Sequence, residues 1–290
     1  MISHLPVMAR EVVEMLDISP GGTYVDATVG LGGHAERLLS LMNAEGRIVG
    51  IDRDEDALVF SGKRLADPRV VLRKGKFSEL REILRADGID EVDGILFDFG
   101  VSMMQFKDMT RGFSFTSDER LDMRMDRSQR LTAEVIVNTW PEKELQRIFR
   151  DYGDEPHAPK IAAAIRAKRA KKRIATCREL AEIVTNTCGA RGKYHAATKI
   201  FQALRIAVND ELGEISNGLG EALDLLKSGG RLCAISYHSL EDRVVKNSLR
   251  SAASRGLVRI LTKKPFVPSH EEIGMNASAR SAKMRGAERT

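Results

Sequence analysis

The sequence predicts a doubly wound α/β fold that carries an inserted all-helical subdomain. Short apolar and β-branched runs alternate with helical patterns from residue 24 to 97, helical patterns alone fill 106–204, and the α/β alternation then resumes. Strands that alternate with helices imply right-handed crossovers and a parallel sheet. We therefore expect one α/β domain formed by 1–105 and 205–290, ending in a basic tail, with 106–204 as the insert.

The elements of the first part are predicted from periodicity. Short runs rich in apolar and β-branched residues predict strands, and apolar residues at helical spacing predict helices. The strands are expected at 24–29, 47–51, 70–72 and 92–97, and the helices between them at 34–42, 56–65 and 80–84.

Helix-start signals and apolar patterns predict the elements of the insert and of the chain after it. In the insert, Thr139–Glu142 and Thr176–Glu179 have the spacing of helix capping boxes, and Pro159 can begin a helix. After the insert we expect a helical stripe over 206–226, a strand over 231–237, a helix over 240–252 capped by Ser239, and a late strand over 257–261. The tail beyond Pro268 shows no clear pattern.

Composition restricts the class of protein. The chain has 290 residues, 42% hydrophobic and 30% charged, with 46 Lys and Arg against 41 Asp and Glu and a net charge of +5. These values are ordinary for a globular protein large enough to need no disulfide or metal for its core. No run approaches a transmembrane length, the N-terminus lacks the pattern of a signal peptide, and the three cysteines are far apart. We expect a cytoplasmic protein with reduced thiols.

A glycine-rich turn after the first strand is the first candidate site. Gly30, Gly32 and Ala35 fit the relaxed dinucleotide fingerprint. Asp26, inside the preceding strand, would repel a pyrophosphate but suits the amino group and sulfonium of S-adenosylmethionine. Asp52, which ends the second strand, can accept both ribose hydroxyls of that cofactor or of NAD. A tight turn without a ligand remains the alternative.

Two further candidates follow strands of the same predicted sheet. Asp98 comes after the strand at 92–97, with Ser102 close behind, and His238 comes after the strand at 231–237. Ligands bind at this carboxyl edge in open α/β sheets. A solvated turn carboxylate at Asp98 and a helix cap near His238 remain structural alternatives. The six histidines and three cysteines show no short ligand spacing, so we expect no metal site.

Two stretches are strongly basic. Seven cations and no acid lie in 160–173, seven cations lie in 243–264, and the tail adds four more. Several such patches on one chain favour a phosphate backbone as ligand, although a single cationic helix is most often a solvated face. The rings of Phe113 and Phe115, beside Arg111, could stack on a base.

Motifs over nearly the whole chain resemble one family, the ribosomal small-subunit RNA (cytosine-N4)-methyltransferases, called RsmH or MraW. The matching segments are His4-x-Pro6-Val7, Tyr24–Thr28 with Gly30-x-Gly32-Gly33-His34, Phe97-Asp98-x-Gly100-Val101-Ser102, Arg111–Phe115, Leu121–Asp126, Phe201–Leu212, Gly229–Arg231, His238–Arg243 and Arg280–Lys283. The resemblance implies the Rossmann-like sheet of class I S-adenosylmethionine methyltransferases. It also implies N4-methylation of a cytidine in the decoding centre of 16S rRNA.

The resemblance and the patterns together give the expected site residues. The resemblance implies cofactor contacts at Gly32, Gly33, His34, Asp52, Phe77, Asp98 and Gln105, and we expect catalytic roles at Asp98, Ser102 and His238. RNA contacts are expected at Arg111, Phe113, Lys168, Arg169, Lys171, Lys172, Arg243, Arg280 and Lys283. The expected partner is 16S rRNA within the small ribosomal subunit, with no membrane. The oligomeric state stays open, a homodimer being one alternative.

Two departures from the family's pattern qualify these expectations. The family's usual Val-Ser-Ser-Pro-Gln is Val101-Ser102-Met103-Met104-Gln105 here, and Tyr237 stands where Phe is usual. Loss of the proline frees the loop and leaves the position of Gln105 open. Two other classes also remain open: a catalytically silent RNA-binding ribosome-assembly factor and an NAD-dependent oxidoreductase.

Overall fold

The computed structural model describes residues 6–189 and 196–290. Its internal contacts divide the chain into two compact units: unit 1 consists of Met1–Gly100 and Leu212–Thr290, and unit 2 of Val101–Glu211. The sequence prediction puts the two boundaries at 105/106 and 204/205, a few residues inside unit 2. Each unit has its own apolar core.

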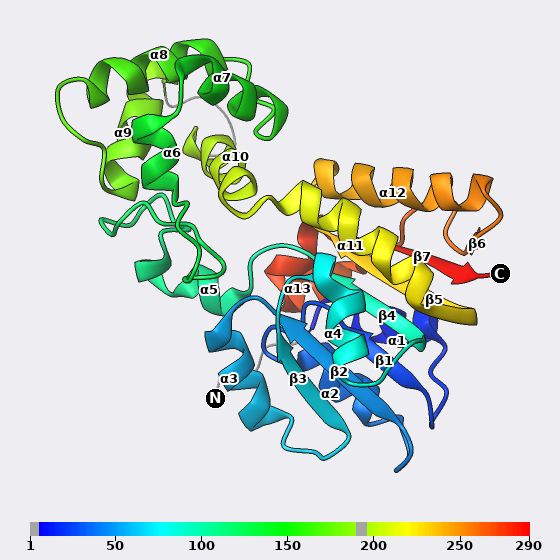
Figure 1. The fold of residues 1–290 in the computed structure, drawn as a ribbon. Helices are drawn as coiled ribbons and strands as arrows, with labels where there is room; N and C mark the ends of the chain where they lie inside the picture. Colours follow the sequence, from blue (N-terminus) through cyan, green and yellow to red (C-terminus); the bar gives the residue numbers. More distant parts are fainter. Residues whose placement is uncertain (1–5, 190–195) are drawn as a thin grey trace. The chain divides into compact units, whose positions relative to one another are not determined.

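Unit 1 is built on a seven-stranded sheet with the strand order β3-β2-β1-β4-β5-β7-β6 (Figure 1). The first five strands run parallel, and β7 pairs antiparallel with both β5 and β6. The strands are β1 (Thr23–Asp26), β2 (Arg47–Asp52), β3 (Val70–Lys74), β4 (Val92–Asp98), β5 (Leu226–Ser236), β6 (Val258–Ile260) and β7 (Lys283–Arg289). The predicted doubly wound α/β class is confirmed.

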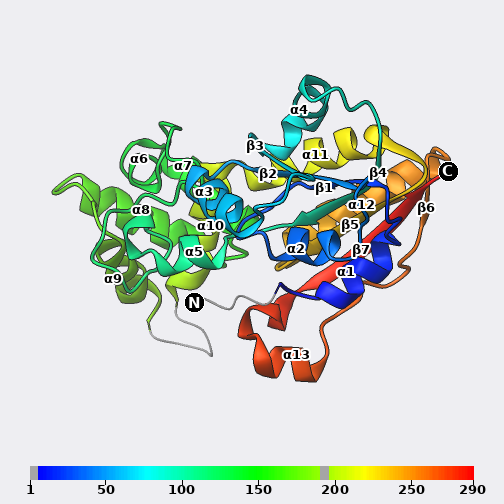
Figure 2. The same ribbon diagram turned by 90° about the horizontal axis from the view of Figure 1, so that it is seen from below.

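Helices cover both faces of this sheet, as Figure 2 shows. Because side chains alternate along a strand, Val25 and Ile95 pack beneath α4, α11 and α12, whereas Tyr24 and Leu96 pack beneath α1 and α2. The helices of unit 1 are α1 (Ala9–Leu16), α2 (Gly33–Leu39), α3 (Glu55–Arg64), α4 (Leu80–Ala86), α11 (Glu211–Leu225), α12 (Ser239–Ser254) and α13 (His270–Met275), with short 3₁₀ turns η1 (Phe77–Glu79) and η3 (Ala277–Ser281).

The expectation of an unpatterned tail is wrong, because β7 lies there. Its segment has no β-branched residue, and long-range contacts explain its place in the sheet. Arg285 is buried but forms an ion pair with Asp242 at 2.7 Å. Gly286 lies against Met15, whose Sδ would be 2.1 Å from an added Cβ, so a larger residue there would force the Met15 side chain to shift.

Unit 2 is helical, and strand-like pairing among its described residues is limited to one isolated bridge, between Arg120 and Thr176. The predicted capping box at Thr176 is confirmed: its hydroxyl accepts from the Glu179 amide, and the Glu179 carboxylate accepts from Thr176. The box predicted at Thr139 is wrong, because this residue ends the preceding helix. The helices are α5 (Met103–Lys107), α6 (Ala133–Thr139), α7 (Glu142–Asp151), α8 (Ala158–Arg169), α9 (Cys177–Cys188) and α10 (Ala197–Asn209), with the 3₁₀ turn η2 (Met109–Arg111).

The single helical stripe expected over 206–226 is two helices. Asp210 adopts a left-handed conformation, with φ of 47°, and separates α10 from α11. None of the helices in the described ranges is long and apolar enough to cross a membrane.

Candidate active site

The carboxyl ends of β1, β2 and β4 bring three aspartates to one edge of the unit 1 sheet. Asp26, Asp52 and Asp98 are the last residues of these strands. The chain order reverses between the adjacent strands β1 and β4, which makes this edge a topological switch point. Open α/β sheets bind their ligands in the crevice outside such a point.

The glycine turn after β1 is tied to the end of β2. Gly30 and Gly32 both have positive φ angles, 48° and 76°, which residues other than glycine rarely adopt. An added Cβ at Gly32 would lie 2.9 Å from Leu65 Cδ1. The Gly30 amide donates a 2.9 Å hydrogen bond to Asp52 Oδ2. The turn leads directly into α2, which begins at Gly33.

Asp52 accepts backbone hydrogen bonds on both oxygens. Besides Gly30, the Asp54 amide donates to Asp52 Oδ1 at 2.9 Å. Burial raises the pKa of Asp52 to about 6, against the effect of these two donors. Each carboxylate oxygen has a second lone pair, so Asp52 can also accept from two hydroxyls of a ribose.

A second polar group lies between β1, α2 and β4. The Thr28 amide donates to Asp26 Oδ1 at 3.3 Å. Asp26 Oδ2 and both ring nitrogens of His34 are buried, and none forms a hydrogen bond with another described residue. His34 Nε2 lies 3.5 Å from Asp98 Oδ2, an ion-pair distance that is long for a hydrogen bond. Buried polar atoms without partners are costly, so this group is suited to a polar ligand.

The charges of this group are coupled. Burial raises the pKa of Asp26 to about 6, with His34 and the Thr28 amide acting against the rise and Asp98 and Asp52 adding to it. Burial opposes protonation of His34, but Asp98 and Asp26 outweigh it, so that the pKa of His34 is raised. The edge is therefore an acidic environment that favours a cation.

Asp98 is positioned by its neighbours on both sides. Its amide donates to Thr28 Oγ1 at 2.7 Å, and the Tyr237 hydroxyl donates to Asp98 Oδ1, also at 2.7 Å. Its side chain is 24% exposed, in contrast to that of His34 at 7%. Asp98 thus has a fixed orientation and is partly accessible to solvent.

Phe77 supplies an aromatic surface beyond the end of β3. Its ring centroid lies 5.8 Å from those of Phe97 and Phe99, and the Arg53 guanidinium lies 5.7 Å above its ring. An added Cβ at Gly218 would be 2.6 Å from the Phe77 ring, so α11 holds the ring in place. The ring is only 8% exposed, so its observed role is in packing, and its expected contact with the cofactor stays a prediction.

Ser102 and Gln105 lie in unit 2, where they cap α5. The Ser102 hydroxyl accepts from the Gln105 amide at 3.2 Å, and Gln105 Oε1 accepts from the Ser102 amide at 3.1 Å. This capping box orients Gln105 without the proline that the family usually has. Both side chains have a local structural role, and their expected catalytic and cofactor roles stay predictions.

His238 is the N-cap of α12, one residue earlier than the predicted cap at Ser239. The His238 ring accepts at Nδ1 from the Glu241 amide at 3.4 Å, and Glu241 Oε2 accepts from the amides of His238 and Tyr237. Glu241 is fully buried. Sequence reasoning expected a cap here but assigned it to Ser239, because His is an uncommon N-cap.

The structure corrects two of the expected RNA contacts. Arg111 and Phe113 are only 4% and 8% exposed. The Arg111 guanidinium donates to the carbonyl of Met125 at 2.8 Å, and Phe113 packs in the core of unit 2. A buried ring offers no face to a base, so both residues have structural roles.

The other expected RNA contacts differ in whether their charged groups already interact with other residues of the protein. Arg169 donates to the carbonyls of Val137 and Trp140 at the end of α6, and Lys172 forms an ion pair with Glu179 at 2.7 Å. The remaining cations are exposed or half-buried: Lys168, Lys171, Arg243, Arg280 and Lys283. Lys283 is the one of these with a described acidic neighbour, Asp242 at 3.8 Å.

Sequence reasoning missed a basic pocket on unit 1. This pocket, of about 380 Å³, lies between α12 and the ends of β6 and β7. It is lined by the cations Lys246, Arg250, Lys263 and Arg285 and by no acidic residue. The sequence pattern shows these cations only as part of a diffuse basic stretch, because the antiparallel pairing of β7 is what brings Arg285 to α12.

The sheet and its edge define a Rossmann-like fold of the class I methyltransferase type, in which an antiparallel last strand inserts beside a parallel sheet. The chain belongs to the MraW methylase family, whose model matches residues 1–290.

Relatives agree with this assignment over their full length. The chain is 46% identical over 306 residues to "Ribosomal RNA small subunit methyltransferase H" of Carboxydothermus hydrogenoformans, which covers 99% of this chain and 98% of that protein. It is 47% identical over 294 residues to the protein of the same name from Persephonella marina, with 100% of both chains covered. Among solved structures, an rRNA methylase from Streptococcus thermophilus superposes with a TM-score of 0.45 at 14% identity, over 100% of this chain and 98% of that one.

Proposed function

We propose that the protein uses S-adenosylmethionine to methylate N4 of a cytidine in the decoding centre of 16S rRNA, within the small ribosomal subunit. The observation that carries the proposal is the convergence of Asp26, His34, Asp52 and Asp98 at one sheet edge, where three buried polar atoms form no hydrogen bond with another described residue. The names of the relatives support a small-subunit rRNA substrate. Such a substrate implies that the protein acts in the cytoplasm.

The residues present fit S-adenosylmethionine better than NAD. Asp26 and Asp98 form an acidic environment suited to an ammonium and a sulfonium group, whereas they would repel a pyrophosphate. Asp52 would accept from the ribose hydroxyls, Gly32 and Gly33 would border the cofactor with their backbone, and Phe77 would contact the adenine. Protonated His34 would donate a hydrogen bond to the carboxylate of the cofactor. When bound, this cofactor supplies an electrophilic methyl group.

Asp98 is the residue that we expect to act on the cytosine. The N4 amine is a poor nucleophile while its lone pair is delocalised into the ring. Asp98 can accept a hydrogen bond from this amine and favour the pyramidal geometry in which the lone pair is available. The methylated nitrogen is more acidic, so water or a weak base suffices to take its proton. The largest contribution of the protein would be alignment of the two reactants.

Unit 2 and the basic surface of unit 1 would bind the RNA. Lys168 and Lys171 extend from the end of α8, and Arg243 and Arg280 are exposed on unit 1. The pocket lined by Lys246 and its neighbouring cations is suited to a backbone phosphate. Contacts of this kind position an RNA and depend strongly on salt.

Methyl transfer to isolated small subunits tests the proposal. Subunits from cells that lack this modification are incubated with the protein and tritium-labelled S-adenosylmethionine, and the 16S rRNA is then digested and its nucleosides are mapped. We expect label in N4-methylcytidine at one position. Label in another nucleoside would overturn the cytosine-N4 assignment, and RNA binding without label would indicate an assembly factor.

A thermal-shift comparison separates the two cofactor classes. S-adenosylmethionine should raise the melting temperature of the full chain, and NAD at the same concentration should not. The opposite result would indicate an oxidoreductase.

A further inference from the structure

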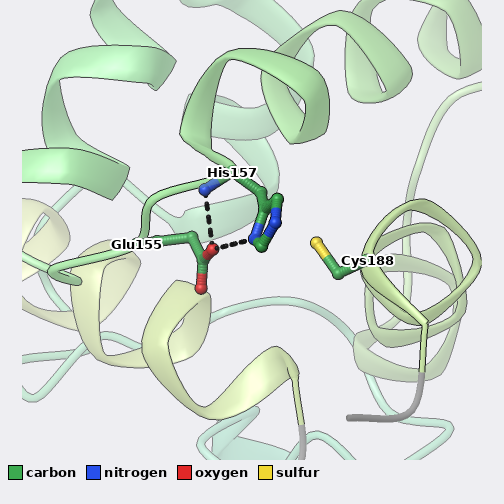
Figure 3. Close-up of side chains that lie close together, drawn as sticks. All are labelled: Glu155, His157 and Cys188. Atoms are coloured by element: carbon green, nitrogen blue, oxygen red, sulfur yellow. Dashed lines mark hydrogen bonds and ion pairs between the residues drawn. The ribbon is translucent and has the colours of Figure 1, made fainter.

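A cluster of three potential metal ligands lies in unit 2, formed by residues to which the proposed methyl transfer assigns no role. Glu155 and His157 lie in the turn before α8, and Cys188 is the last residue of α9 (Figure 3). One ligand atom from each residue lies within 4.8 Å of the other two. The spacing along the sequence did not predict this group, because packing of α8 against α9 brings it together.

Hydrogen bonds already orient two of the three side chains. Glu155 Oε1 accepts from the His157 amide at 2.8 Å and lies 2.9 Å from His157 Nδ1. Figure 3 shows the His157 ring between the Glu155 carboxylate and the Cys188 sulfur. The ligand atoms of the three side chains thus lie close together.

The cluster combines a buried carboxylate with an imidazole that solvent can reach. The Glu155 side chain is only 9% exposed, whereas that of His157 is 50% exposed and gives access from solvent. A bound divalent cation would compensate both the buried carboxylate and a thiolate.

We propose that Glu155, His157 and Cys188 bind one Zn²⁺ ion that links the start of α8 to the end of α9. A thiolate, an imidazole and a carboxylate together are the ligands that zinc takes in proteins, whereas Mg²⁺ and Ca²⁺ prefer oxygen alone. Tetrahedral zinc, with bonds of about 2.0–2.3 Å, places its ligand atoms about 3.3–3.6 Å apart, so small side-chain rotations would close the cluster around it. Cys188 loses its thiol proton to solvent on binding, and water completes the coordination.

Metal titration of the full chain tests this site. The protein is treated with EDTA, freed of chelator, and titrated with Zn²⁺ against a chromogenic indicator, and Co²⁺ is used separately as a spectroscopic probe. We expect one Zn²⁺ per chain and a near-ultraviolet thiolate-to-cobalt charge-transfer band. Cys188→Ser should abolish the band, and His157→Gln and Glu155→Gln should each weaken Zn²⁺ binding, on the order of 10- to 100-fold.

Cys177→Ser is the matched control, since Cys177 begins the same helix and donates a hydrogen bond to the Gly112 carbonyl that serine can replace. This variant should keep both the stoichiometry and the band. Circular dichroism of each variant shows whether unit 2 remains folded. Absence of Zn²⁺ binding by the wild-type chain, or binding that is the same in folded His157→Gln and Glu155→Gln variants, would overturn the proposal.

Discussion

The Tyr237 hydroxyl donates a 2.7 Å hydrogen bond to Oδ1 of Asp98, so the residue after β5 orients the residue that ends β4. The two strands are neighbours in the sheet, with Asp98 in register with Ile235. Burial and the negative charge of Asp98 raise the pKa of Tyr237 well above its ordinary value, so the phenol remains a donor at neutral pH. The family's usual phenylalanine could not make this contact.

Tyr237→Phe should therefore lower stability and preserve activity. The substitution removes a hydrogen bond to a charged group, and such a bond contributes about 1.5–3 kcal/mol to stability. The aromatic ring itself can stay in place. We expect the free energy of unfolding in urea to fall by about this amount, with S-adenosylmethionine affinity changed less than threefold. A loss of affinity or of methyl transfer beyond tenfold would instead make the tyrosine hydroxyl part of the working site.

Asp26→Asn should raise stability at neutral pH and weaken cofactor binding. The folded pKa of Asp26, about 6, lies above its ordinary value of 3.8. Ionisation of this carboxylate therefore lowers the free energy of unfolding. The destabilisation is absent below about pH 4, increases between about pH 4 and 6, and reaches its full size above about pH 6. We expect the variant to gain about 1–3 kcal/mol at pH 7.5 and little at pH 4.

Urea unfolding at the two pH values and calorimetry with S-adenosylmethionine provide the measurements. The gain and the loss together would mark Asp26 as a residue kept for binding at the expense of stability. An equal change in stability at both pH values would contradict the burial argument.

The strands of unit 1 other than β7 were predictable from sequence because each contains a local apolar run between turn signals. The candidate site was predictable as well, because Asp52 and Asp98 stand where those runs end. Strand β7 was not, since Met284 and Ala287 are its main apolar residues and its burial depends on Met15 and Asp242, both distant in sequence.

Burial of polar or aromatic residues was the least predictable feature. Arg111 and Phe113 have the sequence of an exposed RNA-binding loop. Residues distant in sequence instead hold this loop in place. The Cys177 thiol donates to the carbonyl of Gly112, and an added Cβ at Gly112 would lie 2.5 Å from the Arg120 carbonyl oxygen. Such contacts arise from helix packing, which short motifs do not encode.

Asp52→Ala should weaken S-adenosylmethionine by about 1.5–3 kcal/mol, the contribution of a hydrogen bond to a charged group. The substitution also removes the acceptor for the Gly30 amide, which lies in the glycine turn. Asp52→Asn is the matched variant, because it keeps one acceptor oxygen and should lose less affinity. Calorimetry on both folded variants measures the difference, and unchanged affinity in Asp52→Ala would exclude Asp52 from the cofactor site.

Lys168→Gln/Lys171→Gln should flatten the salt dependence of RNA binding. Both lysines are exposed, and neither forms an ion pair with a described residue, so both are available to phosphates. Each contact to single-stranded RNA contributes about 0.7 to the slope of log affinity against log salt, so we expect a decrease of about 1.4.

Arg169→Gln provides the contrast to these lysines. Because its guanidinium donates to two carbonyls at the end of α6, its loss should reduce the stability of unit 2 more than the salt slope. Filter binding from low to high salt measures the slope. A slope unchanged by the double substitution would mean that the end of α8 is a solvated face.

His238 should not act as the general base. Its Nδ1 accepts from the Glu241 amide, which leaves the proton of a neutral ring on Nε2, 3.1 Å from Glu241 Oε1. A ring arranged in this way has no free lone pair for a substrate proton. His238→Asn keeps an N-cap and should retain most of the single-turnover rate, whereas His238→Ala should lose about 0.5–2 kcal/mol of stability. The wild-type rate should show no fall as pH drops through about 6.5. A histidine-like titration that His238→Asn abolishes, with RNA affinity intact, would make His238 the base.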